Sequence, residues 1–135
     1  MVARILLFIL TLFIGYAYAS ELDSTTDGEI LHLFDFINAS ECEFNRNGLW
    51  YDATKAAKHI RRKYEYALGK GLIDSTEDFI AYAASKSSMS GKKYIVQCGD
   101  SAEVFCSEWL SDELMKYRSS KKLGPRHSVT ERGHP

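Results

Sequence analysis

The sequence lacks every complete catalytic or metal-binding motif that can be recognised from spacing alone. It contains neither the G-x-S-x-G turn of serine hydrolases nor a phosphate-binding P-loop. No two of its three cysteines are spaced as C-x-x-C, so neither a zinc site nor a redox motif is indicated. Its net charge of −1 gives no overall basic excess for binding a polyanion. We therefore expect no metal, no cofactor, no nucleic-acid partner and no enzymatic activity.

Long apolar runs are also absent, except at the start of the chain. Arg4 precedes the apolar residues 5–14, and Ala17-Tyr18-Ala19 has the small-x-small pattern that a signal peptidase accepts. This order is typical of a secretory signal peptide, and the segment is too short for a membrane span. We predict a signal peptide over residues 1–19 with cleavage after Ala19. No stable membrane insertion is expected afterwards, because no later segment approaches ~18 apolar residues.

The remaining length and composition predict a single domain. Removal of residues 1–19 leaves 116 residues, enough for one compact domain and too few for two. We place this globular domain at residues 20–118. The last segment, 119–135, is basic and has almost nothing to bury, so we predict a disordered basic tail there.

The few cysteines nevertheless predict a disulfide. Cys42, Cys98 and Cys106 all follow the signal peptide, and in an oxidising compartment two of them are expected to pair. The third is then free or paired between chains. Three pairings are possible, and the sequence does not choose among them. We favour a bond from Cys42 to one of the other two, because it closes a longer loop and stabilises more than a Cys98–Cys106 bond.

Charge is distributed unevenly along the chain. Residues 20–43 carry seven acidic and no basic side chains, whereas residues 44–95 carry ten basic and five acidic ones. Ordinary solvated faces are the simplest interpretation of such a pattern. The asymmetry also permits a basic face for an anionic partner.

Apolar spacing predicts four helices. The first lies near residues 27–39, and the second begins at an Asp52 cap and ends near residues 69–71. The third opens with Ser75 and Asp78 in a capping-box arrangement, and the fourth spans about 107–118.

A small sheet accompanies these helices. Asn47-Gly48 lies between two short aromatic-rich flanks and is a strong hairpin signal, because both turn residues must take φ > 0. The β-branched run after Tyr94 predicts another strand within residues 93–98. We therefore predict a helix-dominated α+β single domain of about four helices with a two- or three-stranded antiparallel sheet. An all-α fold is the alternative.

Four phrases occur together in the middle of the chain. They are F-x-R-N-G at 44–48, H-I-R-x-K at 59–63, I-D-x-x-E-x-F-I at 73–80 and A-S-x-S-S-x-S-G-K-x-Y-I-V at 84–96. In this order they resemble the YfeK-like family of small, uncharacterised periplasmic proteins. The resemblance covers about half of the mature chain. It implies export to a bacterial periplasm and a domain of unknown function, and it supplies no activity and no catalytic residues.

The serine- and lysine-rich loop before the predicted strand has three interpretations. In the simplest, its serines cap the preceding helix and Gly91 makes the turn. Ser90 and Lys93 have the S-x-x-K spacing of some hydrolases, but those enzymes place it at a helix start, whereas a strand follows here. A Ser/Lys hydrolase is therefore a lesser alternative. The pattern S-G-x-x-Y, ending at Tyr94, resembles the loop that some periplasmic lysozyme inhibitors insert into a lysozyme cleft, so inhibition of a cell-wall hydrolase is the main alternative function.

The polar residues inside the family-like phrases are the candidate binding site. Lysines at 55 and 63 flank His59 by one helical turn, which predicts a lowered pKa and discourages metal binding. We predict a small periplasmic binding or interaction protein whose partner is a protein or an anionic small ligand. The candidate residues are Arg46, His59, Lys63, Ser85, Ser88, Ser90, Gly91 and Tyr94.

Overall fold

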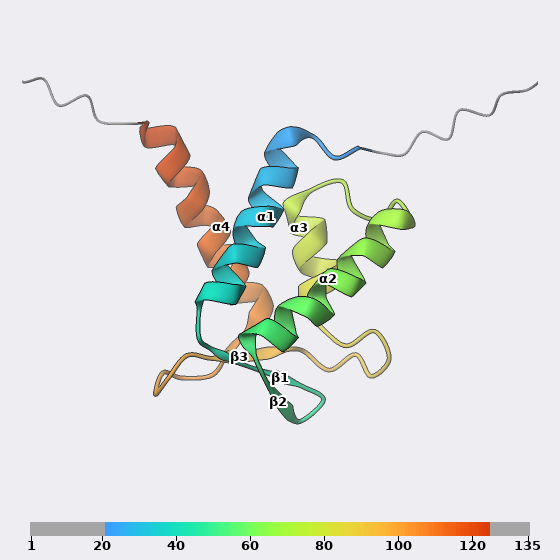
Figure 1. Cartoon of the computed structure of the whole chain (residues 1–135), viewed down its shortest axis with the longest axis vertical. Helices are drawn as coiled ribbons and strands as arrows, with labels where there is room; N and C mark the ends of the chain where they lie inside the picture. Colours follow the sequence, from blue (N-terminus) through green and yellow to red (C-terminus); the bar gives the residue numbers. More distant parts are fainter. Residues whose placement is uncertain (1–20, 125–135) are drawn as a thin grey trace, which may run out of the picture.

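A computed structural model describes residues 21–124 and confirms the predicted helix-dominated α+β class (Figure 1). Four α-helices and four short strands occur in this part of the chain, and α3 continues directly into a π-helical turn, η1. In chain order the elements are α1 (Ser24–Ala39), β1 (Glu43–Arg46), β2 (Leu49–Asp52), α2 (Ala53–Gly69), α3 (Thr76–Phe79), η1 (Ile80–Ala84), β3 (Ile95–Gln97), β4 (Val104–Phe105) and α4 (Cys106–Leu123).

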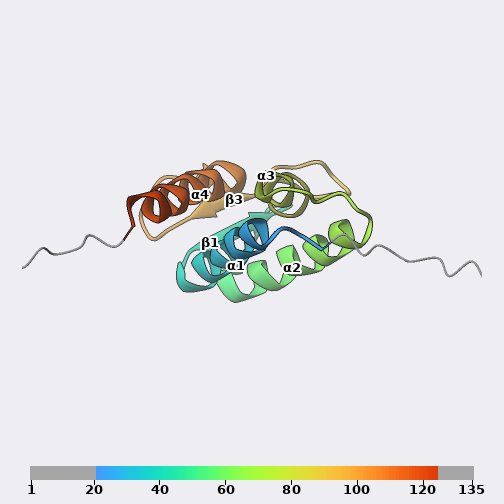
Figure 2. The same ribbon diagram turned by 90° about the horizontal axis from the view of Figure 1, so that it is seen from above.

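The helices form two layers above the sheet. Figure 2 shows α1 and α2 side by side, with α3 and α4 in the second layer. The strands lie across one end of these helices (Figure 1). Aromatic side chains fill the space between the layers: the Phe34 ring centroid lies 5.2 Å from that of Phe79, and Tyr64 meets Phe79 edge-on at 5.5 Å. Burial of this apolar core is the main force that holds the helices together.

Side-chain caps set where the helices begin. The Asp23 carboxylate accepts hydrogen bonds from the backbone N–H groups of Thr25 and Thr26, so α1 starts three residues earlier than the spacing predicted. The predicted Asp52 cap is confirmed by a 2.8 Å bond from the Lys55 N–H. The capping box of Ser75 and Asp78 is also confirmed, with both reciprocal bonds present.

The sheet is antiparallel with strand order β2-β1-β3-β4, which is one strand more than the two or three predicted. Asn47 and Gly48 have φ of 54° and 85°, which confirms the hairpin turn. The additional strand, β4, has only two residues. A pair of residues shows no alternation, so only its pairing with β3, Val96 opposite Val104, reveals it.

The last helix runs beyond its predicted end at residue 118 to Leu123, so residues 119–123, which we had assigned to the tail, are helical. Ser119 and Ser120 donate hydrogen bonds to backbone carbonyls of the preceding turn, and two lysines lie near the negative end of the helix dipole. The signal peptide and the remainder of the tail lie outside residues 21–124. Within those residues, no helix is both long enough and apolar enough to cross a membrane.

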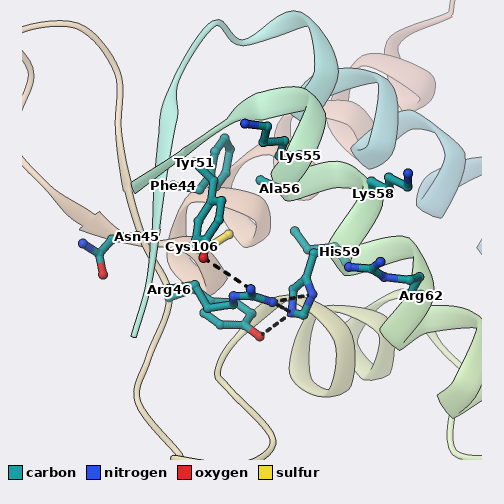
Figure 3. A pocket seen from close by; sticks show the side chains of 12 residues that line it. Phe44, Asn45, Arg46, Tyr51, Lys55, Ala56, Lys58, His59, Arg62 and Cys106 are labelled. Atoms are coloured by element: carbon teal, nitrogen blue, oxygen red, sulfur yellow. Dashed lines mark hydrogen bonds between the residues drawn. The ribbon is translucent and has the colours of Figure 1, made fainter. Parts of the chain in front are cut away.

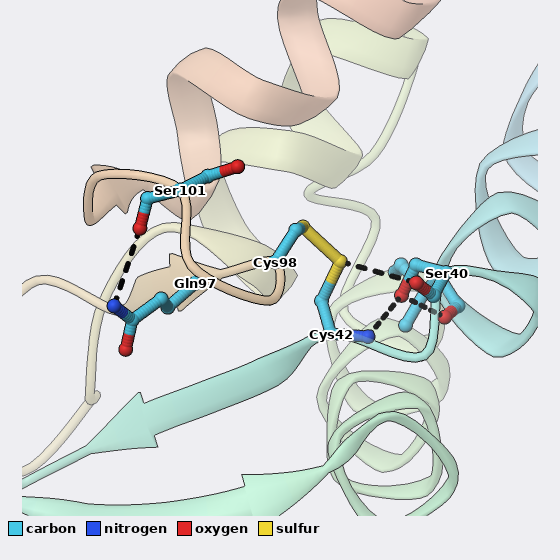
Figure 4. The surroundings of a disulfide bond; sticks show 6 residues. Ser40, Cys42, Gln97, Cys98 and Ser101 are labelled. Atoms are coloured by element: carbon cyan, nitrogen blue, oxygen red, sulfur yellow. Dashed lines mark hydrogen bonds between the residues drawn. A yellow bond between two sulfur atoms is a disulfide. The ribbon is translucent and has the colours of Figure 1, made fainter.

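A disulfide joins Cys42 to Cys98, which confirms the predicted pairing of Cys42 and identifies its partner (Figure 4). The bond ties the residue before β1 to the residue after β3. Cys106 is a free, fully buried thiol, and burial raises its pKa to about 12. It therefore stays protonated at neutral pH and is a poor nucleophile.

Candidate functional site

Four of the eight candidate residues converge beside the sheet. The Arg46 Nη1 atom lies 2.6 Å from His59 Nδ1 and 2.9 Å from His59 Nε2. The Tyr94 hydroxyl lies 3.1 Å from His59 Nε2 and accepts a hydrogen bond from Lys63 Nζ at 3.3 Å. We call these four residues, Arg46, His59, Lys63 and Tyr94, the basic cluster.

Three separate segments bring the basic cluster together. Arg46 is the last residue of β1 before the Asn-Gly turn, and His59 and Lys63 lie one turn apart on α2. Tyr94 precedes β3, and its backbone is fixed on both sides: its N–H donates to the Ser85 carbonyl and its carbonyl accepts from the Cys106 N–H. Since the disulfide ties β1 to β3, the segments that carry Arg46 and Tyr94 are held together covalently.

His59 is neutral in this environment. Burial, followed by the positive charges of Arg46, Lys63 and Arg62, lowers the pKa of His59 to about 4. The lowered pKa was predicted from neighbouring lysines, but burial is the larger cause. A guanidinium can only donate hydrogen bonds, so the contact with Arg46 also requires an unprotonated ring nitrogen.

The surroundings of Lys63, like those of His59, disfavour the positively charged form of the side chain. Burial and the nearby charges of Arg46 and Lys86 lower its pKa. Its ammonium group donates to the Lys86 carbonyl oxygen at 2.5 Å and to the Tyr94 hydroxyl. Both acceptors are neutral, so these hydrogen bonds do not compensate the positive charge.

No carboxylate in residues 21–124 forms an ion pair with the basic cluster. The ion pairs of this part of the chain join other residues: His32 with Glu113, Lys55 with Asp52, and Arg118 with two glutamates. Arg62 and Lys86, which add positive charge around the cluster, have no carboxylate partner there either. Among the described residues, the cluster is thus a partly buried group of donors and positive charges without a counterion.

Two hollows border the cluster and share Arg46, His59 and Arg62 as walls. The first, with a volume of about 240 Å³, lies between β1, β2 and α2; Figure 3 shows Phe44 and Tyr51 on the strand side and His59 and Arg62 on the helix side. The second, of about 470 Å³, extends toward Tyr66 and Tyr82. The shared wall is therefore accessible from either hollow.

The other four predicted residues, Ser85, Ser88, Ser90 and Gly91, form no side-chain hydrogen bond with the cluster. Ser88 lines the second hollow, whereas the Ser85 hydroxyl, directly after η1, donates to the carbonyl of Ile80, the first residue of η1. Ser90 donates to Asn47 Oδ1 at 2.6 Å and thereby fixes the loop to the β1–β2 turn. Gly91 has φ of 71°, which suits glycine and makes the turn. Ser85, Ser90 and Gly91 therefore shape the loop that carries Tyr94.

Residues 24–118 match a family of unknown function, DUF5329. The chain belongs to this family. No curated protein and no solved structure matches the chain. The DUF5329 match includes all four strands and all three segments that form the basic cluster, so the candidate site lies within the family domain.

Sequence reasoning missed several residues that line the two hollows. Lys55 and Arg62 were not among the predicted site residues, although they lie four and three residues from His59 and thus on its side of α2. Helical spacing from His59 was the signal that could have found them. Tyr51 offered no such signal, because its position depends on the register that pairs it with Phe44 across β1 and β2.

Metal binding finds no support in this arrangement. Within residues 21–124, no group of three or more His, Cys, Asp or Glu side chains lies close enough together to hold a metal ion. The single histidine of the cluster is surrounded by positive charge, which opposes cation binding. What the arrangement can do chemically is donate hydrogen bonds to an anion.

Proposed function

We propose that this DUF5329 member is an exported binding protein that holds an anionic group of a small ligand or partner protein at the basic cluster, without catalysing a reaction. The observation that carries the proposal is the half-buried Lys63 and Arg46 beside a neutral His59, with no carboxylate partner within residues 21–124. Grouping positive charges away from water costs stability unless something offsets it. A bound anion offsets that cost and accepts the available hydrogen bonds.

Inorganic phosphate and sulfate are suitable first probes. At low ionic strength, each should raise the Tm of the wild-type protein above the value in sodium chloride of equal ionic strength. At ten times the Kd, one bound anion adds about 1.4 kcal/mol, which corresponds to roughly 5 °C or more in a domain of this size.

Matched variants make this test specific. Lys63→Ala and Arg46→Ala should abolish the phosphate-dependent rise in Tm. Lys116→Ala removes the same charge from an exposed position on α4 and should retain the whole rise. The same response in Lys63→Ala and Lys116→Ala would show that phosphate acts through general charge screening, and the proposal would fail.

Export to the periplasm is part of the proposal. The Cys42–Cys98 bond supports an oxidising compartment, and the resemblance to YfeK-like proteins and the signal-peptide pattern point in the same direction. Cell fractionation followed by mass spectrometry of the intact protein tests it. We expect the periplasmic fraction to hold a chain that begins at Ser20 and carries one disulfide. A full-length chain in the cytoplasm would contradict export.

The alternative functions have less support in the geometry. Tyr94 is 5% exposed and its hydroxyl faces His59 and Lys63, so it does not project as an inhibitory loop residue would. The Ser90 hydroxyl donates to an asparagine oxygen, which is not a general base. We expect no loss of lytic rate when lysozyme is titrated with the protein, and no labelling of Ser90 by a fluorophosphonate.

A further inference from the structure

The smaller hollow has a composition that simple anion binding leaves unexplained. Its rim is cationic, with Arg46 and Arg62 contributing guanidinium groups. Its inner wall is formed by Phe44, Ala56 and Ile60, which are only 4%, 8% and 2% exposed. A hydrated phosphate or sulfate ion would contact the rim and leave this apolar wall unused.

The apolar wall is flat and aromatic on its strand side. Phe44 and Tyr51 are directly opposite each other across β1 and β2, which places their rings next to each other on one face of the sheet. The Arg46 guanidinium lies 5.0 Å from the centroid of the Tyr51 ring and its Nη2 atom lies 3.4 Å from the Tyr51 hydroxyl. The aromatic wall and the anion-binding donors are therefore adjacent.

The volume of the hollow fits a ring with an attached anionic group. An apolar cavity of about 150 Å³ in another protein is sufficient for benzene. The hollow between β1, β2 and α2 has about 240 Å³, which leaves room for a small oxyanion beside a six-membered ring. A flat ring can stack against the aromatic wall while its charged group reaches Arg46.

Resting on the proposed function, we infer that the ligand is a small aromatic anion, an aryl phosphate or aryl carboxylate. Its ring lies between Phe44, Tyr51 and Ala56 in the smaller hollow. Its charged group lies at the wall that the two hollows share, where Arg46 and Arg62 donate hydrogen bonds to it and Lys63 adjoins from the larger hollow. The larger hollow is about twice as large, and its apolar wall is formed by the exposed side chains of Tyr66, Leu72 and Tyr82, so a single ring fills it less completely.

Calorimetric titration of the wild-type protein with paired probes tests the ligand class. Phenyl phosphate should bind at least about tenfold more tightly than inorganic phosphate, and benzoate should exceed acetate in the same way, because each ring buries apolar surface. Equal affinities within each pair would overturn the inference about the ring while leaving anion binding intact. No binding of any of the four probes would instead refute the proposed function.

A pair of variants on α2 tests the location. Ala56→Leu fills the smaller hollow and changes no charge, so it should remove the advantage of phenyl phosphate while inorganic phosphate binds within twofold of wild type. Ala67→Leu is the matched control, because Ala67 lines only the larger hollow. It should preserve the advantage. A tenfold preference that persists in Ala56→Leu would place the ring elsewhere and overturn the assignment.

A measurement on the wild-type protein covers the case in which Ala56→Leu does not fold. In the phenyl phosphate complex, nuclear Overhauser effects should connect the ring protons with the methyl groups of Ala56 and Ile60. Their absence in a saturated complex would also overturn the assignment.

Discussion

Two groups of charged side chains in this domain are built in opposite ways. Between the ends of α1 and α4 that lie away from the sheet, Arg118 forms a bidentate pair with Glu29, with nitrogen–oxygen distances of 2.7 and 2.8 Å, and also bonds Glu77. Thr76 donates a further hydrogen bond to Glu29. We call these four residues the ion-pair cluster. Beside the sheet, the basic cluster contains positive charges and donors but no carboxylate.

The pKa shifts express the same contrast. In the ion-pair cluster, hydrogen bonds from Arg118 lower the pKa values of Glu29 and Glu77 despite burial, so the charged forms are favoured. In the basic cluster, burial and like charges lower the pKa values of His59 and Lys63, so the charged forms are disfavoured. The first arrangement stabilises the fold, whereas the second is tolerated by it, and this difference is why we assign a binding role only to the basic cluster.

Removing the disulfide should have the largest effect, because no ion pair within residues 21–124 holds the segments of the basic cluster together. The Cys42–Cys98 bond spans a sequence separation of 56 residues, for which loop-closure entropy predicts about 4 kcal/mol of stabilisation. The Cys42→Ala/Cys98→Ala double variant should lose roughly this much free energy of unfolding in urea. Its anion affinity should fall as well, since β1 and β3 are no longer tied. A loss below about 1 kcal/mol would contradict this role for the bond.

Breaking the ion-pair cluster should be the next largest effect. Arg118→Met leaves the Glu29 carboxylate, whose side chain is 8% exposed, without its cationic partner. We expect a loss of about 3 kcal/mol in the free energy of unfolding and an unchanged affinity for phosphate. The Lys116→Ala variant on the same helix serves as the control for loss of one α4 charge. If Arg118→Met also abolished phosphate binding, the two clusters would not be independent.

The corresponding substitution in the basic cluster should have the opposite effects on stability and on phosphate binding. Lys63→Met removes a half-buried charge next to Arg46 and Lys86, so repulsion is relieved while two hydrogen bonds to neutral acceptors are lost. We expect the free energy of unfolding at low ionic strength to stay within about 1 kcal/mol of wild type or to rise. Phosphate binding should disappear. A loss comparable to that of Arg118→Met would show that Lys63 has a structural role.

The last effect is the smallest at neutral pH, and it separates the two clusters by their dependence on pH. The pKa of His59 is about 4 in the folded protein and 6.5 as a reference value, so between pH 6.5 and pH 4 only the unfolded chain takes up the proton. Stability therefore falls as the pH falls through this window, and His59→Gln should flatten that part of the profile. The pKa values of Glu29 and Glu77 are lowered from 4.5, so their contribution to the free energy of unfolding is lost as the pH falls below about 4.5. Urea unfolding at a series of pH values measures both windows. An unchanged slope between pH 6.5 and 4 in His59→Gln would show that the imidazole takes up its proton equally in the folded and the unfolded states, which would contradict the lowered pKa.

The basic cluster shows which parts of the site were predictable. His59 and Lys63 are four residues apart on a helix that begins at a strong cap, so their shared face follows from helical periodicity. Arg46 directly precedes Asn47-Gly48, and these two residues favour the positive φ values of a hairpin turn. The position of Arg46 at the end of a hairpin strand was therefore also predictable. Ser90, by contrast, looked reactive in sequence but lies against Asn47, because the loop folds back on the turn.

Local sequence alone thus determined the helices and the hairpin, since caps, periodicity and turn chemistry act over a few residues. Tertiary structure decided three matters that local rules do not reach. It chose Cys98 over Cys106 as the partner of Cys42, it paired Val104 with Val96 to add a fourth strand, and it placed Tyr94 between His59 and Lys63. Each depends on contacts between segments far apart in the chain, whose geometry is fixed only when the shared core is packed.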